Sequence, residues 1–279
     1  MNIQYSAFSE NIKEAVLLML NADNVSGHLF RRILSDAPEC CRMILTEGEP
    51  AGFVFSERSG AGLYVMPFIA REMRGRGIGS AVLRQAEADA GQDITKLTGF
   101  FNKADAAAAV FAEKHGFTRH FDSDYMEYTG GMMEIGPLPV RPYRDEDYLE
   151  AHKMYAEAFH RMRVQVGDFP DSIPYPPTEK NRAAWLADAE NYFMYVEDGA
   201  IVGVGHLNGG EIGSVSVRID RQGNGIGRKF ALYLMNEILR RGHEKVALEC
   251  VVGNFARRLY DSLGFRALYT ERFVDKKIR

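Results

Sequence analysis

The sequence repeats itself at a fixed distance. The glycine-rich run Arg74-Gly75-Arg76-Gly77-Ile78-Gly79 returns as Gln222-Gly223-Asn224-Gly225-Ile226-Gly227. A second anchor, His115-Gly116-Phe117, returns as Leu263-Gly264-Phe265, and both anchors recur 148 residues later (77 to 225 and 116 to 264). Two anchors that share one offset predict a duplicated domain.

The expected elements follow the same order in both halves. In the first half we expect strands at 2–8, 41–46, 51–56, 62–70 and 94–101, helices at 11–20, 25–34, 79–90 and 105–115, and a final strand pair to about residue 129. In the second, Asp145 can cap a helix to about residue 162, strands fit 192–197, 201–208, 212–219 and 245–251, and a helix follows Gly227 to about residue 241. Residues 131–139 lack periodicity and predict a linker between domains at 1–130 and 140–279. The fold class is therefore mixed α/β, with two twisted sheets flanked by helices.

The glycine-rich runs have a physical interpretation as anion sites. Glycine tolerates positive φ and has no side chain, so successive backbone N–H groups can point toward one ligand. A helix that begins there adds unpaired N–H groups and a positive dipole end, which favours phosphate or pyrophosphate. Neither run ends in Gly-Lys-Ser/Thr or has the glycine spacing of a dinucleotide fingerprint. A glycine-rich connection without a ligand is the alternative.

The Arg/Gln-x-x-Gly-x-Gly pattern resembles the acetyl-CoA loop of the GCN5-related N-acetyltransferases (GNAT). Residues 217–227 and 256–265 both look like that family, and the resemblance covers nearly the whole chain in two copies. It implies two tandem GNAT-like domains that use acetyl-CoA as co-substrate, with a backbone N–H near Val217 or Ile69 polarising the thioester carbonyl. The implied cofactor-binding residues are Val217, Gln222, Gly223, Asn224, Gly225, Ile226, Gly227, Arg228 and Asn254 in the second half, and Ile69, Arg74, Gly75, Arg76, Gly77, Ile78 and Gly79 in the first.

The resemblance implies a general acid in the second half only. The family's tyrosine before the Gly-Phe segment corresponds to Tyr260, whereas the offset of 148 places Ala112 there in the first half. A tyrosine with a pKa of about 10 can protonate a thiolate whose parent thiol has a pKa of about 8.5, and alanine cannot. A buried helix tyrosine that only packs on the sheet is the alternative for Tyr260. The first half is therefore expected to hold cofactor and to be catalytically degenerate.

The general base is expected on the strand before that helix. Glu249 matches the glutamate base of related enzymes that acetylate protein N-termini, and Glu211 is the reserve candidate. Counted forward from Glu249, Asn254 takes the family's asparagine position, but counted back from Tyr260 Gly253 takes it, so a bulge or short turn must absorb one residue. A solvent-facing glutamate is the alternative for Glu249. Cys250 is expected to be a buried small hydrophobe.

Composition narrows the class of protein. A formal net charge of −4 argues against a protein that coats nucleic acid. The aliphatic run at 15–20 is too short to cross a membrane and follows no basic region, so we expect no membrane span and no signal peptide. Three cysteines give no disulfide framework, and no histidine or cysteine spacing suggests a metal site. A cytoplasmic location is expected.

The sequence thus predicts an acetyltransferase that moves an acetyl group from acetyl-CoA to a primary amine of a small molecule or peptide by direct attack. The alternatives are a non-catalytic acyl-CoA-binding or scaffolding protein and a tandem enzyme whose first domain is active. Residues 167–177 contain four prolines and have no counterpart in the first half. In the resembled family such a connection forms part of the acceptor wall, and a stiff surface loop is the alternative.

Overall fold

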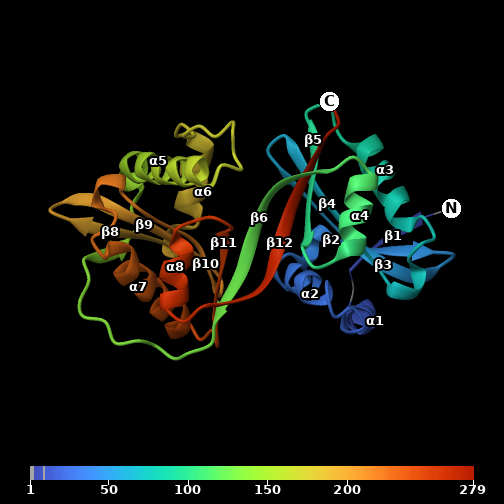
Figure 1. The fold of residues 1–279 in the computed structure, drawn as a ribbon, viewed down its shortest axis with the longest axis horizontal. Helices are drawn as coiled ribbons and strands as arrows, with labels where there is room; N and C mark the ends of the chain where they lie inside the picture. Colours follow the sequence, from blue (N-terminus) through green and yellow to red (C-terminus); the bar gives the residue numbers. More distant parts are fainter. Residues whose placement is uncertain (1–2, 9) are drawn as a thin grey trace. The chain divides into compact units, whose positions relative to one another are not determined.

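The contacts of the computed structural model divide the chain into two compact units (Figure 1). The structure describes residues 3–8 and 10–279, and side chains only outside 10–13. The first unit contains Met1–Asp122 and Thr270–Arg279, and the second contains Ser123–Tyr269. Each unit combines parallel and antiparallel strand pairs with flanking helices, in agreement with the predicted mixed α/β class.

The first unit is built on a sheet in which one pair of strands is parallel. Its strands are β1 (Ile3–Ala7), β2 (Cys41–Thr46), β3 (Glu49–Ser59), β4 (Gly62–Ile69) and β5 (Lys96–Asn102), and its helices are α1 (Glu10–Asn21), α2 (Gly27–Asp36), α3 (Ile78–Asp89) and α4 (Ala106–Lys114). Neighbouring strands pair in chain order, antiparallel except for β4 with β5. The expected first strand is therefore present as β1, with Asn2 outside the described residues.

The second unit repeats this plan. Its strands are β7 (Val140–Pro142), β8 (Tyr192–Glu197), β9 (Ala200–Asn208), β10 (Glu211–Val217) and β11 (Val246–Val251), and its helices are α5 (Tyr148–Val166), α6 (Glu179–Ala187), α7 (Ile226–Arg240) and α8 (Ala256–Ser262). Again the strands pair in chain order and only β10 with β11 is parallel. The two parallel pairs therefore occupy equivalent places in the two units.

The last strand of each half completes the sheet of the other half. Strand β6 (Thr118–Tyr128) follows the first half, yet its residues 123–128 pair antiparallel with β11. Strand β12 (Arg266–Lys277) ends the second half, yet its residues 271–277 pair antiparallel with β5. Domains bounded at 1–130 and 140–279 would place residues 123–128 in the first unit and residues 271–277 in the second. In the structure each of these segments belongs to the other unit.

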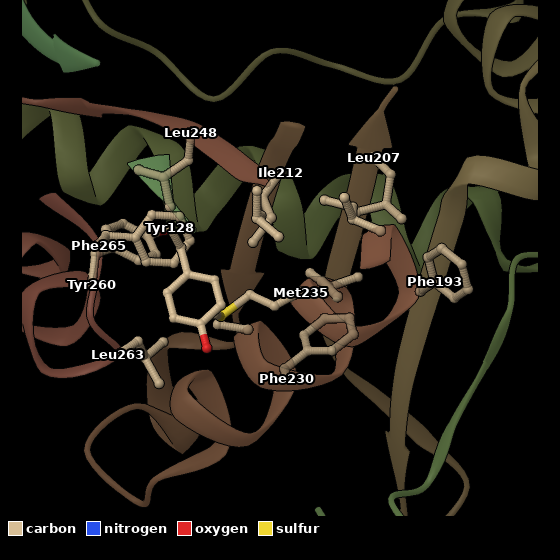
Figure 2. Close-up of a cluster of buried hydrophobic side chains, with 14 of the residues drawn as sticks. Tyr128, Phe193, Leu207, Ile212, Phe230, Met235, Leu248, Tyr260, Leu263 and Phe265 are labelled. Atoms are coloured by element: carbon tan, nitrogen blue, oxygen red, sulfur yellow. The ribbon is translucent and has the colours of Figure 1, made fainter. Parts of the chain in front are cut away.

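The core of the second unit lies on both faces of its sheet. Helix α7 packs on one face, where Phe230 and Leu234 are buried with strand residues (Figure 2). Helix α5 packs on the other face, where Met154 and Val204 are buried (Figure 1). Gly205 lets α7 approach closely, because a Cβ there would lie 2.7 Å from a Leu234 methyl carbon. Helices α5 and α7 therefore cover opposite faces of the sheet, and both contact β10.

The start of α5 differs from expectation. Asp145 lies in a 3₁₀ turn and α5 begins only at Tyr148. Instead of capping that helix, the Asp145 carboxylate accepts two hydrogen bonds from Arg182, at 2.9 and 2.7 Å. The capping prediction is wrong because a guanidinium on α6 offers charge-assisted bonds that compete with the backbone donors.

Candidate active site

Each glycine-rich run forms the same loop between a strand and a helix. A 3₁₀ turn follows the strand, and the first and second glycines have positive φ: 76° and 81° for Gly75 and Gly77, 82° and 78° for Gly223 and Gly225. The second glycine is the N-cap of the following helix, α3 or α7, and makes no side-chain cap bond. Because no other group comes within 4 Å of a Cβ built on these glycines, the loop faces open space. Such a loop presents helix N–H groups to an anion.

A side chain latches each loop to the strand that precedes it. The Arg74 Nε donates to the Ile69 carbonyl oxygen at 2.9 Å, and the Gln222 Nε2 donates to the Val217 carbonyl oxygen at 2.9 Å. Arginine in one loop and glutamine in the other can make the same bond, because each side chain can place an N–H donor against the carbonyl oxygen five residues earlier. Arg74 also pairs with Asp23, so part of its charge is already compensated. Its primary role in the structure is to shape the loop.

The parallel strands next to each loop separate toward their carboxyl ends. Among the described residues, ladder pairs between β4 and β5 join 62–64 to 96–98, and those between β10 and β11 join 211–212 to 247–248. Beyond these pairs the strand edges face each other without a ladder. Backbone polar groups at such a gap can bond a ligand that lies in it.

A cavity of about 410 Å³ occupies this gap in the first unit. The loop, the separated strands, α4 and the start of α2 contribute its walls, which are mostly apolar. Representative lining residues are Phe30, Val65, Phe68, Ile69, Gly77, Ser80, Phe100 and Phe111. Ala112 also lines the cavity, and it offers no proton donor there. The cavity therefore suits a long, largely apolar arm with an anion at one end.

Two polar pairs at this cavity have no sequence signature. The Ser80 Oγ lies 2.8 Å from the His115 Nε2, and the Ser26 Oγ donates to Asp105 at 2.6 Å. Burial, together with the charges of nearby Lys114 and other cations, lowers the pKa of His115. Ser26 and Asp105 are 79 residues apart, so no local spacing could have paired them. Ser80 directly follows the loop, and that position is the one signal that could have drawn attention to it.

In the second unit, Tyr260 lies in the core between α8 and the sheet. Its side chain is 7% exposed and meets Phe265 edge-on, with ring centroids 5.8 Å apart (Figure 2). Burial raises the pKa of Tyr260, and the nearby Cys250 thiol raises it further. Burial also raises the pKa of Cys250 to about 11, so this thiol stays protonated near neutral pH, as expected for a buried hydrophobe.

Glu249 and Tyr260 belong to opposite faces of the same sheet. Leu248 and Cys250 point into the core that contains Tyr260, so the alternation of a strand directs Glu249 to the other face, where it is exposed. Glu211 begins β10, where that strand is still paired with β11, about 20 Å of extended chain from Val217. The structure therefore brings Glu249, and not Glu211, toward the separated end of the strands.

The turn after β11 explains why counting from Glu249 and counting from Tyr260 give different residues, Asn254 and Gly253, for the family's asparagine position. Gly253 has a φ of 93°, and the Asn254 N–H donates to the Val251 carbonyl oxygen at 3.0 Å. The Asn254 Oδ1 accepts the Ala256 N–H at 2.9 Å. The tight turn absorbs the missing residue, and the Asn254 side chain shapes the start of α8.

The proline-containing segment at 167–177 closes over the C-terminal half of α5. Gly167 ends the helix in the left-handed conformation, and the His160 Nδ1 lies 3.1 Å from the Ser172 Oγ. Ile173 and Tyr175 are 60% and 59% exposed. The segment thus presents apolar groups to solvent on the Glu249 face of the sheet, where α5 packs.

Comparison with known proteins agrees with this architecture. An acetyltransferase (GNAT) domain model matches residues 38–119, and the model of the FR47-like protein matches residues 198–274. The chain therefore belongs to the GCN5-related N-acetyltransferases and carries two GNAT-like domains. No curated protein sequence matches it.

Solved structures share the fold over both halves at low sequence identity. A GCN5-related N-acetyltransferase from Sphaerobacter thermophilus has a TM-score of 0.71 and 20% identity, covering 99% of this chain and 96% of that chain. A tandem GNAT protein from the clavulanic acid biosynthesis pathway has a TM-score of 0.62 and 16% identity, covering 100% and 99%. An acetyltransferase of the GNAT family from Colwellia psychrerythraea has a TM-score of 0.59 and 12% identity, covering 100% of both chains. Among the described helices, none has the length and apolar character that a membrane crossing requires.

Proposed function

We propose that the protein transfers an acetyl group from acetyl-CoA to a primary amine, with the chemistry in the second unit. One observation carries the proposal: in each unit a latched, left-handed glycine loop opens a helix beside two parallel strands that separate. The loop can bind the pyrophosphate of the cofactor, and the gap can take its pantetheine arm and thioester. GNAT membership supports acyl transfer in general.

The proposed reaction uses both faces of the second sheet. Glu249 takes a proton from the acceptor ammonium, and the amine nitrogen attacks the thioester carbonyl. A backbone N–H at Val217 stabilises the oxyanion that forms. The C–S bond then breaks, and Tyr260 donates its phenolic proton to the departing thiolate. The attacking nitrogen gives up its second proton as the amide forms, and transfer of that proton through water restores the Tyr260 phenol. A base on the acceptor face and an acid on the cofactor face place the two proton transfers on opposite sides of the reacting carbon.

Burial suits Tyr260 to the role of proton donor. Its raised pKa keeps the phenol protonated over the whole physiological range, so the donor form is always present. The same burial makes it a weaker acid, and it therefore acts by hydrogen bonding to the sulfur until the thiolate develops. Ala112 at the equivalent place gives the first unit a cofactor cavity without this donor.

A second candidate function follows from the cavity itself. The cavity of about 410 Å³ belongs to the first unit, which favours acyl-CoA binding there. Under the main proposal this site holds cofactor without turnover; under the alternative the first unit is the catalyst or the whole protein is a non-catalytic acyl-CoA binder.

Tyr260→Phe tests the main proposal. The change keeps the ring and its contact with Phe265 but removes the proton, so turnover should fall by about 10² to 10⁴. Acetyl-CoA affinity and melting temperature should stay close to the parent's, because the loop is untouched. The readout is steady-state thiol release with a panel of primary amines, and Ala112→Ser serves as the matched control without effect. Unchanged turnover in Tyr260→Phe would contradict the assignment.

A further inference from the structure

One arginine on the Glu249 face of the second unit is held by aromatic rings instead of by an acid. The Arg163 guanidinium carbon lies 6.0 Å from the ring centre of Phe159, 5.9 Å from that of Phe169 and 5.6 Å from that of Tyr175. Within the part of the chain that the structure describes, this side chain has no ion pair and no hydrogen bond. Rings bind a guanidinium through its faces, which leaves its N–H donors available to a ligand. Arg163 is therefore oriented by its surroundings before any anion binds.

Helix α5 places Arg163 at the separated end of the strands. The Ser216 Oγ of β10 lies 3.9 Å from the Met154 sulfur of α5. At the end of the helix, a Cβ built on Gly253 would lie 3.8 Å from a methyl carbon of Val166. The helix thus runs from the separated part of β10 to the exit of β11. Arg163 falls between these contacts, on the face to which β11 directs Glu249.

We propose that Arg163 binds the carboxylate of the acceptor, so that the second unit acetylates an amine that also carries a carboxylate group. This inference rests on the proposed function and names the class of its acceptor. A guanidinium offers two parallel donors that match the two oxygens of a carboxylate. Arg163 supplies a single guanidinium to this face, and Glu249 is an acidic residue on the same face. A singly charged carboxylate suits that balance better than a doubly charged phosphate.

The rim of this face favours an apolar side chain on the acceptor. Tyr175 and Ile173 in the proline-containing segment are 59% and 60% exposed. Aromatic and branched groups left in solvent at a binding site usually contact apolar parts of a ligand. An amino acid with an aromatic side chain is therefore the appropriate probe.

The test measures binding of reaction products, so it does not depend on turnover. Calorimetry on the CoA-saturated protein compares N-acetyl-L-phenylalanine with N-acetylphenethylamine, which lacks only the carboxylate. A charge-assisted pair should make the carboxylate product bind about 10- to 100-fold more tightly. Arg163→Met should remove this advantage and leave the neutral product unchanged. Arg161→Met, an exposed change on the same helix, should keep the parent's preference.

Control variants separate binding from folding. Arg163→Lys keeps the charge without the planar fork, so it should bind the carboxylate product with intermediate affinity. Unchanged affinity for the neutral product reports that Arg163→Met is folded. The proposal is overturned by equal affinity for both products in the parent, by equal loss for both in Arg163→Met, or by no binding of either. It is also overturned if the phosphonate analogue of N-acetylphenylalanine binds more tightly than the carboxylate.

The same experiment distinguishes this inference from the proposed function. Arg163-dependent discrimination between the two products, without thiol release from any amine, would overturn the acetyltransferase proposal and keep the anion site. Thiol release without that discrimination would overturn the role of Arg163 alone.

Discussion

At the scale of single residues, Asp122 shows how a buried charge holds an exchanged strand. Its carboxylate accepts two hydrogen bonds from Arg272 of β12, at 2.9 and 3.1 Å, and lies 3.0 Å from the Lys103 ammonium. Burial alone would raise the pKa of Asp122, but these cations outweigh it and lower the pKa to about 2. The ionised form is therefore bound more strongly in the folded unit than in the unfolded chain.

Replacing this carboxylate should cost stability in a pH-dependent way. Because the folded pKa is depressed, the contribution of Asp122 is fully present above about pH 4 and is lost as the pH falls toward 2. Asp122→Asn should lower the free energy of unfolding by about 2 kcal/mol at pH 7, and the difference from the parent should shrink near pH 2.5. Urea unfolding at both pH values measures this.

Asp93→Asn is the control for Asp122→Asn, because Asp93 is exposed and pairs with an exposed arginine. It should have little effect at either pH. A loss in Asp122→Asn that is the same at pH 7 and pH 2.5 would contradict the electrostatic account.

At the scale of elements, the glycine loop depends on its latch to the preceding strand. The first unit makes this bond with Arg74 and the second with Gln222, each to a carbonyl at the end of the strand. Gln222→Ala should therefore loosen the loop and weaken acetyl-CoA binding to the second unit by about tenfold, the value of one hydrogen bond. Gln222→Arg should restore affinity, since arginine already makes this bond in the first unit.

Calorimetric titration with acetyl-CoA measures the effect of these latch variants. Arg240→Ala is the control, because Arg240 is the last residue of α7, at the end opposite the loop, and pairs with Glu237. Failure of Gln222→Arg to recover affinity, with Gln222→Ala weakened, would show that the side chain acts on the ligand directly and not through the latch.

Local patterns in the sequence were enough to predict the elements around the site, because each depends on neighbouring residues. The left-handed glycines and the helix starts at Ile78 and Ile226 follow from residues a few positions apart. The exchange of β6 and β12 could not be predicted, because a strand has the same pattern whichever sheet it joins. The contacts of Arg163 with the rings of residues 169 and 175 could not be predicted either. They depend on the segment after α5 folding back onto that helix, which no local pattern specifies.

At the scale of the whole molecule, the exchanged strands make the two halves of the chain interdependent. A fragment of residues 1–130 lacks β12, so the edge of β5 loses its partner at 271–277. Unpaired edges are costly and prone to aggregation. We therefore expect this fragment to show no cooperative melting transition by circular dichroism, and a synthetic peptide of residues 266–279 to restore one. Cooperative melting of the fragment without the peptide would contradict this.

The central claim is that both loops bind acetyl-CoA and that only the second unit turns it over. Gly225→Asp and Gly77→Asp place a side chain and a negative charge where phosphate should approach, at positions whose φ is 78° and 81°. The decisive measurement is steady-state thiol release by these two variants, alongside the calorimetric stoichiometry of acetyl-CoA. The account predicts a stoichiometry near two in the parent and near one in each variant, with turnover lost in Gly225→Asp and retained in Gly77→Asp. Turnover lost in Gly77→Asp and retained in Gly225→Asp would place catalysis in the first unit.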